Sequence, residues 1–345
     1  MSGNGVVDDV KRIFDDLGDV AERLQAGRFA ASVQPMAEGA ASDPVVEATR
    51  RERERVVGKG IDGLTKLAEG REDDLDNDER FGLEAIVLLE GRPAILIQEG
   101  DFLRPPHEWS RLTDHREGIR EVIARSGRVE INGHLNLDWL GTASLVAPTT
   151  LMTNRHVARE FCSRHGDKWV FRHGMTTRID FLEELGSTST LEFEITEAIG
   201  IHDDHDLALL RVEQTSSDGH VLPDPLPVAA TELPDLFERD VYVVGYPAWD
   251  SRRNEPEPIR RIFTDIYNVK RLQPGKAVGY STAYSAIEHD CSTLGGNSGS
   301  PVVDLETHQV IGLHFGGRYG VGNYAVPLWT LADDPLLKKA DLNFQ

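Results

Sequence analysis

Apolar residues recur every three or four positions at the start of the chain, which is the spacing of an amphipathic helix. The pattern runs from Val6 to Leu24 and predicts one helix there. The small-residue stretch AASVQPMAEGAASDP, residues 30–44, predicts a linker. Residues 45–70 regain helical spacing and predict a second helix, which its internal glycines weaken.

The next segments mix helical and other signals. The acidic run REDDLDNDER (71–80) predicts a solvated turn or a helix cap, because it lacks the spacing of a calcium-binding EF-hand. In LEAIVLLEGRPAILIQ (83–98), two apolar runs flank a Gly and a Pro. They predict a hairpin, but the first run equally fits the end of a helix, and both interpretations stay open. Residues 107–127 return to helical spacing and end at Gly127, a predicted C-cap.

After Gly127 the pattern changes to short runs rich in β-branched and apolar residues, broken by Gly, Pro and Asp. Many short strands with little helix predict an all-β barrel or sandwich domain. The pattern therefore predicts a helical N-terminal region over 1–127 and a β domain over 128–345. The runs are RVEING, GTASLVA, TTLMTN, KWVFR, TLEFEITEAI, LALLRV, VYVVGYP, SPVVD and QVIGLHFGG.

Composition limits the class of protein and its partners. The chain has 345 residues, and its apolar fraction of 39% is enough for a sizeable core. A formal net charge of −21 disfavours nucleic acid and anionic membranes as partners. The N-terminus does not resemble a secretory signal, and no apolar stretch is long enough for a bilayer. With only Cys162 and Cys291, a disulfide framework is excluded, which favours a reducing compartment, the cytoplasm.

The segment CSTLGGNSGSP, residues 291–301, concentrates glycines around Ser298. A serine hydroxyl is a weak nucleophile that needs a base, an acid to orient the base, and donors for the oxyanion. The glycines allow a tight turn in which the N–H groups of Gly296 and Ser298 point to one place. The alternative is a glycine-rich turn without chemistry.

A base and an acid for this serine are found in two other segments. In TTLMTNRHVAREF, a strand-like run leads into His156 and then a short helical turn. In IHDDHDLALLRV, Asp206 directly precedes an apolar strand, so its carboxylate can be partly buried and orient an imidazole. Asp203 and Asp204 are rivals, but nothing apolar follows them directly, and we expect them to be solvated loop charges.

The order His156, Asp206, Ser298 is that of chymotrypsin. GTASLVAPTTLMTNRHVA, DLALLRV and GGNSGSPVVD resemble the His, Asp and Ser blocks of trypsin-like serine peptidases of the chymotrypsin fold, in their disulfide-free bacterial branch. The resemblance covers about residues 128–329. It implies two packed six-stranded barrels, Ser298 as nucleophile, His156 as general base and then acid, Asp206 as the orienting group, and the Gly296 and Ser298 amides as oxyanion hole. No cofactor and no metal are expected.

Three residues bear on cleavage specificity. Relatives that cut after Lys or Arg carry an aspartate six positions before the serine, where this chain has Ser292. VIGLHFGG resembles the wall strand of glutamyl endopeptidases and of viral proteases that cut after Gln. That resemblance implies that His314 and Thr293 hydrogen-bond a Glu or Gln side chain before the scissile bond. The alternative is that both residues are structural.

The sequence thus predicts an intracellular serine endopeptidase that acts on a protein or peptide substrate. The digestive relatives are activated by a newly cut N-terminal amine, but here more than a hundred residues precede the barrels. Activity must therefore arise without that step or be switched on by processing or a partner, and the N-terminal helices are candidates to dock a regulatory partner. The alternatives are a catalytically silent peptide-binding module and an esterase on the same fold.

Overall fold

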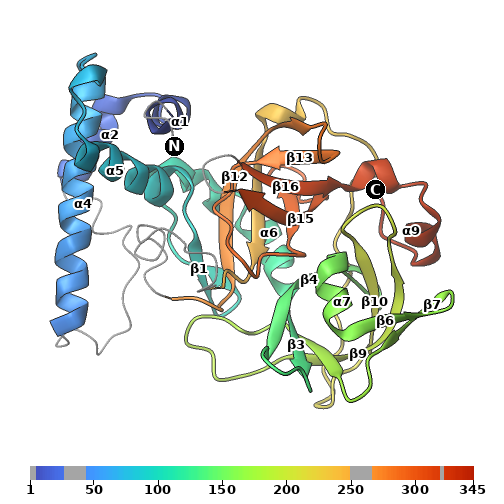
Figure 1. Ribbon diagram of the computed structural model, residues 1–345. Helices are drawn as coiled ribbons and strands as arrows, with labels where there is room; N and C mark the ends of the chain where they lie inside the picture. The colour runs from blue at the N-terminus through green and yellow to red at the C-terminus, as the bar shows by residue number, and fades with distance from the viewer. Residues whose placement is uncertain (1–4, 27–43, 249–265, 319–321) are drawn as a thin grey trace. The chain divides into compact units, whose positions relative to one another are not determined.

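The computed structural model describes residues 5–26, 44–248, 266–318 and 322–345 (Figure 1). Its contacts divide the chain into two units. The helical unit comprises 1–94, 103–113 and 250–266, and the β unit comprises 95–102, 114–249 and 267–345. Apart from Pro44, the predicted linker at 30–44 lies outside the described residues. The domain boundary at residue 127 stays a prediction.

The helical unit begins with two helices where the sequence predicted one. They are α1 (Gly5–Ile13) and α2 (Leu17–Gln25). The prediction of one continuous helix was wrong because Asp16, at the junction, accepts a hydrogen bond from the Asp19 amide and so starts a new helix. α4 (Pro44–Ala68) confirms the second predicted helix. Short helical segments η1 (Glu72–Asp74) and η3 (His107–Thr113) also belong to this unit.

Of the two interpretations left open for 83–98, the helix end is confirmed and the hairpin was wrong, because the first apolar run finishes a helix. α5 (Asn77–Ile86) continues into a π-helical turn, η2 (Val87–Gly91). Leu83, Ile86 and Val87 lie three and four positions apart, so a helix buries them together in the core of the unit. The second run forms β1 (Ile95–Gln98), which pairs with β2 (Asp101–Phe102).

Two glycines allow α4 and α5 to pack closely. A Cβ atom on Gly60 would lie 2.4 Å from the Gly82 carbonyl oxygen, and one on Gly82 would lie 2.2 Å from the Gly60 nitrogen. The glycines that lower the helix propensity of α4 therefore include one that its packing requires. The core around this crossing consists of Val7, Val10, Phe14, Val20, Ala21, Leu24, Leu64, Leu67, Leu75, Leu83, Ile86 and Val87.

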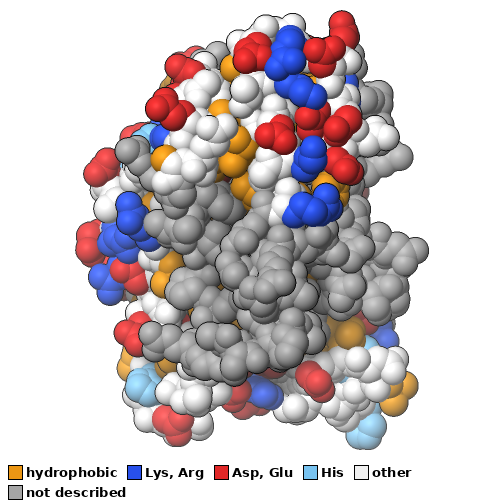
Figure 2. Space-filling view, turned by 90° about the vertical axis from the view of Figure 1, so that its left-hand side faces the viewer, with side chains coloured by type: hydrophobic (Ala, Val, Ile, Leu, Met, Phe, Trp, Pro, Cys, Tyr) orange, Lys and Arg blue, Asp and Glu red, His pale blue; other side chains and the backbone are white. Residues whose placement is uncertain are grey.

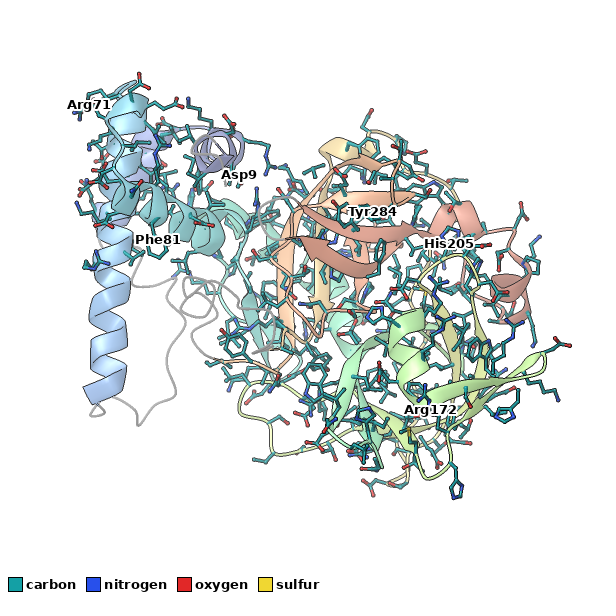
Figure 3. All side chains as sticks on the ribbon, viewed as in Figure 1. Asp9, Arg71, Phe81, Arg172, His205 and Tyr284 are labelled. Carbon is teal, nitrogen blue, oxygen red and sulfur yellow. The ribbon has the colours of Figure 1, made fainter. Side chains whose placement is uncertain are left out.

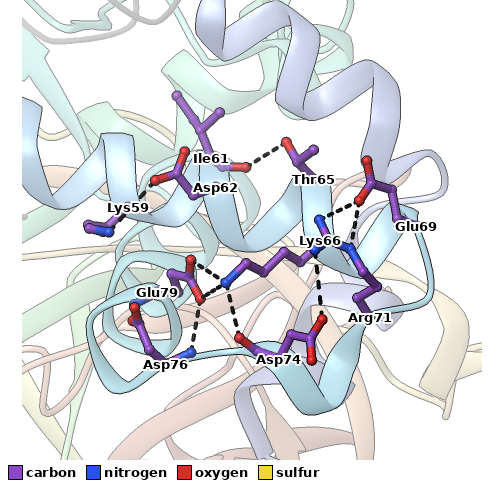
Figure 4. Close-up of polar contacts among 10 residues, drawn as sticks. All are labelled: Lys59, Ile61, Asp62, Thr65, Lys66, Glu69, Arg71, Asp74, Asp76 and Glu79. Carbon is purple, nitrogen blue, oxygen red and sulfur yellow. Dashed lines mark hydrogen bonds and ion pairs between the residues drawn. The ribbon is translucent and has the colours of Figure 1, made fainter.

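Ion pairs also support this packing. Figure 2 shows acidic and basic side chains interspersed with apolar ones on one face of the molecule. Asp9 of α1, labelled in Figure 3, lies 2.9 Å from Arg92 Nη2. Lys66 of α4 donates to Glu79 Oε2 at 2.8 Å (Figure 4). Glu79 also completes a capping box with Asp76 at the start of α5, which confirms the cap predicted for the acidic run.

The β unit holds two barrels, and the first is a closed ring of six strands in the order β10-β5-β4-β3-β8-β9. α6 (Arg116–Ala124) leads into it. The predicted C-cap at Gly127 was wrong, because Gly127 already pairs with Ala143 inside the first strand. The six strands are β3 (Ser126–Asn132), β4 (Trp139–Ala147), β5 (Thr150–Thr153), β8 (Thr176–Asp180), β9 (Glu192–Ile201) and β10 (Ala208–Val212). α7 (Arg155–Phe161), β6 (Cys162–His165) and β7 (Lys168–Phe171) are insertions between β5 and β8.

The second barrel is the ring β11-β14-β15-β16-β13-β12, which the β11–β12 pairing closes. β1 pairs with the outer edge of β12. The strands are β11 (Asp240–Gly245), β12 (Arg271–Ser281), β13 (Ala286–His289), β14 (Pro301–Asp304), β15 (Val310–Arg318) and β16 (Gly322–Pro327); η4 (Leu236–Glu238), η5 (Leu328–Leu331) and α9 (Pro335–Lys339) complete the unit. The predicted mainly β double barrel with preceding helices is confirmed. In the part of the chain that the structure describes, no helix has the length and apolar character needed to cross a membrane.

Candidate active site

His156 lies at the start of α7, directly after β5. The opposite side of this short helix, with Val157, Ala158 and Phe161, is buried in the first barrel. Because that side is fixed by the core, the imidazole of His156 is directed outward, and its side chain is 51% exposed. The strand-to-helix transition predicted around His156 is therefore present.

Asp206 holds His156 through two hydrogen bonds, one with the imidazole and one with the backbone amide. His156 Nδ1 lies 2.6 Å from Asp206 Oδ2, and the His156 amide donates to Asp206 Oδ1 at 2.9 Å. Burial raises the pKa of Asp206, but the hydrogen bonds from His156 and the attraction of the carboxylate to this imidazole when it is protonated outweigh the effect of burial, so the pKa lies below the ordinary value. The ionised carboxylate keeps the proton on Nδ1, which leaves His156 Nε2 free to accept a proton.

The two rival carboxylates lie at the surface. Asp203 and Asp204 are exposed, and the Asp203 side chain lies 3.4 Å from Arg164. The backbone oxygen of Asp203 accepts a hydrogen bond from Arg155 at 2.5 Å. These two aspartates are therefore loop charges, as expected, and Asp206 is the carboxylate that contacts the histidine.

The turn around Ser298 depends on glycine at two positions. Gly296 and Gly299 have φ values of +88° and +89°. A Cβ atom on Gly296 would lie 2.3 Å from the backbone oxygen of Tyr246, and one on Gly299 would lie 2.1 Å from the backbone oxygen of Thr142. Thr142 of β4 binds the turn from the first barrel. Its amide donates to the backbone oxygen of Ser298 and its hydroxyl to the backbone oxygen of Gly296, both at 2.9 Å.

The backbone N–H groups of Gly296 and Ser298, which are predicted to form the oxyanion hole, donate no hydrogen bond to another group of the described residues. Asn297 between them is buried, and its amide donates to the Leu294 oxygen at 3.2 Å. Two neighbouring free amides can stabilise an oxyanion without first breaking a hydrogen bond.

Ser298 and His156 approach each other across β4. A Cβ atom on Gly141 would lie 2.8 Å from the backbone oxygen of Ser298 and 3.0 Å from Val157 Cγ2. The serine turn and the histidine helix therefore both lie against Gly141. Among the hydrogen bonds of the described residues there is none between Ser298 and His156. The structure thus joins His156 directly to Asp206 and places the Ser298 turn and the His156 helix next to the same residue, Gly141.

His314, a candidate specificity residue, is buried next to the serine turn. Its oxygen accepts from the Gly299 amide at 2.9 Å. Its Nδ1 lies 3.1 Å from Nε2 of His289, which the sequence analysis missed. Burial lowers the pKa of His289 to about 4. Burial, followed by repulsion from His289 and His156 when these are protonated, lowers the pKa of His314 well below its ordinary value.

Thr293 is hydrogen-bonded to a second residue that the sequence analysis missed, Asn323. The Asn323 side-chain amide donates to the Cys291 oxygen at 2.7 Å, so Asn323 Oδ1 faces Thr293 and accepts its hydroxyl proton, also at 2.7 Å. The Ser292 oxygen accepts a hydrogen bond from Gln273. Asp290, the remaining carboxylate near this segment, accepts from the Lys276 amide at 2.6 Å.

Both missed residues face the site from strands distant in the sequence. His289 ends β13 and Asn323 is in β16, and the two are register partners. A histidine and an asparagine in short strands carry no local signal of such a role. Only the strand pairing, which depends on the whole barrel, shows their position.

The sequence of this chain is similar to a known protein family and to curated proteins. A model of the trypsin-like peptidase domain matches residues 141–313. A probable serine protease of Lysobacter enzymogenes is 29% identical over 89% of this chain and 90% of its own length. The glutamyl endopeptidase of Staphylococcus aureus (strain MW2) is 25% identical over 67% of this chain, and the match spans 65% of that protein.

Solved structures with a similar fold include two bacterial enzymes. The serine endoprotease from Yersinia pestis has a TM-score of 0.44 and 16% identity, covering 66% of each chain. A protease from M. tuberculosis in its active form has a TM-score of 0.43 and 18% identity, covering 67% of this chain and 87% of its own.

Proposed function

Because the chain belongs to the trypsin-like peptidase family and is a serine peptidase, we propose that Ser298, His156 and Asp206 are its catalytic triad. The observation that carries this proposal is the 2.6 Å contact between His156 Nδ1 and Asp206 Oδ2. This contact fixes the tautomer in which Nε2 can act as a base.

The proposed reaction proceeds through an acyl-enzyme. His156 Nε2 takes the proton of the Ser298 hydroxyl as Oγ attacks the carbonyl carbon of the substrate. The Gly296 and Ser298 amides donate to the oxygen that becomes negative. His156 then gives its proton to the leaving amine, the peptide bond breaks, and water activated by the same imidazole releases the acid product.

We further propose that the enzyme cleaves after Gln or Glu. Among the described residues, His289 Nδ1 is buried and has no hydrogen-bond partner. A buried acceptor without a partner is less costly than a buried N–H without one, so the proton of His289 belongs on Nε2, where it donates to His314 Nδ1. The neutral His314 then carries its proton on Nε2 and can donate it to a side-chain oxygen of the substrate.

The hydrogen-bonding state of Thr293 favours Gln over Glu at neutral pH. Its hydroxyl proton is donated to Asn323, so Thr293 offers only lone pairs to a substrate. A carboxamide presents one oxygen to His314 and one N–H to Thr293, whereas a carboxylate has no proton for Thr293. Support for this class of substrate also comes from the similarity to a glutamyl endopeptidase. Ser292 has no carboxylate, and the Asp290 carboxylate already accepts a hydrogen bond from the Lys276 amide. Neither residue therefore offers a free carboxylate to a Lys or Arg side chain of the substrate.

The alternatives of a silent peptide-binding module and an esterase are tested with one probe and one substrate. A fluorophosphonate should label the wild type and not Ser298→Ala. Ser300→Ala is the matched control, because Ser300 is in the same turn but is buried. An unlabelled wild type would support the silent module. Labelling without cleavage of any protein substrate that contains Gln or Glu would support the esterase.

Cytoplasmic location and partner docking complete the proposal. Cys162 and Cys291 are both buried and do not form a disulfide, and burial raises the pKa of Cys162 to about 12, so its thiol is unreactive. The helical unit has a core of its own, which suits a separate docking module. Fractionation of cells that express the tagged chain, with a periplasmic and a cytoplasmic marker, tests the location.

A further inference from the structure

The turn that carries Asp206 is built around the imidazole of His202. His202 Nδ1 accepts hydrogen bonds from the amides of Asp204 at 3.1 Å and His205 at 3.0 Å. The His202 amide donates to the Leu207 oxygen at 2.9 Å and closes the turn between β9 and β10. These two amides have no backbone acceptor within a turn of this length, and the imidazole accepts their hydrogen bonds instead.

The other nitrogen of this ring faces the C-terminal helix. His202 Nε2 lies 3.3 Å from Asp334 Oδ2. Because Nδ1 accepts two N–H groups, the proton is on Nε2 and is donated to the carboxylate. Asp334 Oδ1 meanwhile caps α9 by accepting from the amides of Leu336 at 2.8 Å and Leu337 at 3.4 Å.

Packing holds this pair in place. The side chains of His202 and Asp334 are only 11% and 20% exposed. The His202 ring contacts the ring of His205, with centroids 4.9 Å apart, and His205 is labelled at this turn in Figure 3. Leu336 of α9 packs on Gly200, where a Cβ atom would lie 2.4 Å from Leu336 Cδ1.

The turn needs such an anchor because its outer residues are solvated while Asp206 must keep two directed hydrogen bonds to His156. Asn154 provides one further contact, since its side-chain amide donates to the backbone oxygen of Asp206 at 2.8 Å. The Arg155 guanidinium provides another, because it donates to the backbone oxygen of His202 at 3.3 Å. His202 thus connects the strand end, the turn amides and α9 at one point.

We propose that His202 and Asp334 are positioning residues for the reaction, which hold the Asp206 carboxylate against His156 by fixing the tautomer of His202. The inference rests on the proposed triad. It makes the C-terminal helix a functional part of the active site, although α9 supplies no catalytic residue.

Two substitutions of Asp334 separate this role from helix capping. In Asp334→Asn, the amide oxygen can still cap α9, but its NH₂ group then faces the His202 Nε2–H, donor against donor. His202 is forced toward the Nδ1–H tautomer, which cannot accept from the turn amides. Asp334→Ser keeps a good N-cap and leaves the tautomer free. We expect kcat to fall about tenfold or more in Asp334→Asn, less than about threefold in Asp334→Ser, and KM to change little in both.

Substitutions of His202 provide a rescue test. His202→Leu removes the acceptor, and we expect a loss in kcat of about tenfold or more. His202→Asn retains an oxygen that can accept from the amides two and three positions on, as in an Asx-turn, and should recover most of that loss. Equal kcat in both variants, with native circular dichroism, would overturn the proposal.

The rate of Ser298 labelling by a fluorophosphonate is the second readout, because it reports on the triad without a specificity site. If the wild type is not labelled, the proposed function fails. If it is labelled and Asp334→Asn is labelled equally fast, the positioning role fails while the proposed function stands. Long-range ¹H–¹⁵N spectra read the tautomer of His202 independently of activity and of the variants. An Nδ1–H signal for His202 in the wild type would overturn the inference.

Discussion

Replacing Thr293 by Val tests the specificity proposal at a single atom. Valine keeps the branched shape of threonine and replaces the hydroxyl by a methyl group. In the wild type that hydroxyl donates to Asn323, so only its lone pairs remain for a substrate. Under the proposed specificity, a Gln substrate donates to these lone pairs and a Glu substrate has no proton to donate. The substitution should therefore reduce cleavage after Gln and spare cleavage after Glu.

The size of the effect follows from the hydrogen bond that is lost. A polar group left unpaired in a buried site costs about 1–3 kcal/mol. Since about 1.4 kcal/mol corresponds to a factor of ten in rate, kcat/KM for Gln should fall about 5- to 150-fold. Glu should lose less, because its carboxylate never had a proton to donate to Thr293.

The assay compares two peptides that differ only in Gln or Glu before the scissile bond. Thr330→Val is the control, because it removes a hydroxyl that donates to the Pro327 oxygen outside the site. The low pKa of His314 keeps its imidazole neutral at neutral pH. A Glu side chain gains a proton below about pH 4.3 and can then donate an O–H to Thr293, so the preference should move from Gln toward Glu as the pH falls.

An unchanged ratio of Gln to Glu cleavage in Thr293→Val would refute this reasoning. So would a peptide-library profile dominated by Lys, Arg or bulky aromatic residues. In either case Thr293 and His314 would be structural residues of the second barrel.

Three further predictions concern the triad, the acid limit and the domain boundary. Asp206→Asn should lower kcat by about four orders of magnitude through the wrong tautomer of His156, with an unchanged melting temperature; near-normal turnover would contradict the triad. His289 stays neutral in the fold down to about pH 4, whereas the unfolded chain takes up its proton below about pH 6.5. The free energy of unfolding should therefore fall by about 3 kcal/mol between these pH values, and urea titrations should show a smaller loss in His289→Gln. Deleting 1–94 leaves β1 and should give soluble protein, whereas deleting 1–127 removes β1, β2 and α6 and should give insoluble protein, as sedimentation after lysis would show.

The sequence located those parts of the site whose chemistry is carried by contiguous residues. The turn at Ser298 and the strand-to-helix transition at His156 are each encoded within about ten positions. Asp206 could be chosen over its neighbours because the apolar strand directly after it anchors one side of the turn. His289 and Asn323 could not be found in this way, because strand register places them beside the site and no local pattern determines that register.

The fold was predictable for the same physical reason and with the same limit. Runs of β-branched residues marked most strands of the first barrel. β12 was missed because its buried positions include Arg271 and Gln273, which interrupt the apolar pattern. The residues before Gly91 were ambiguous, since a short apolar run fits a buried strand and a buried helix equally well. There, packing against α4 decided the outcome.

The last residues of the chain have a consequence for how the cell makes this enzyme. The Asn343 amide donates to the Val146 oxygen of the first barrel, and Phe344 forms a bridge to Val228. Residues 1–94 of the helical unit precede both barrels in the chain, whereas Ser298, the strands that complete the second barrel and the contacts of Asn343 and Phe344 follow the first barrel and are synthesised after it. A nascent chain therefore presents the first barrel, with His156 and Asp206, well before it can cut anything, so the order of translation itself protects the cell from a partly made protease.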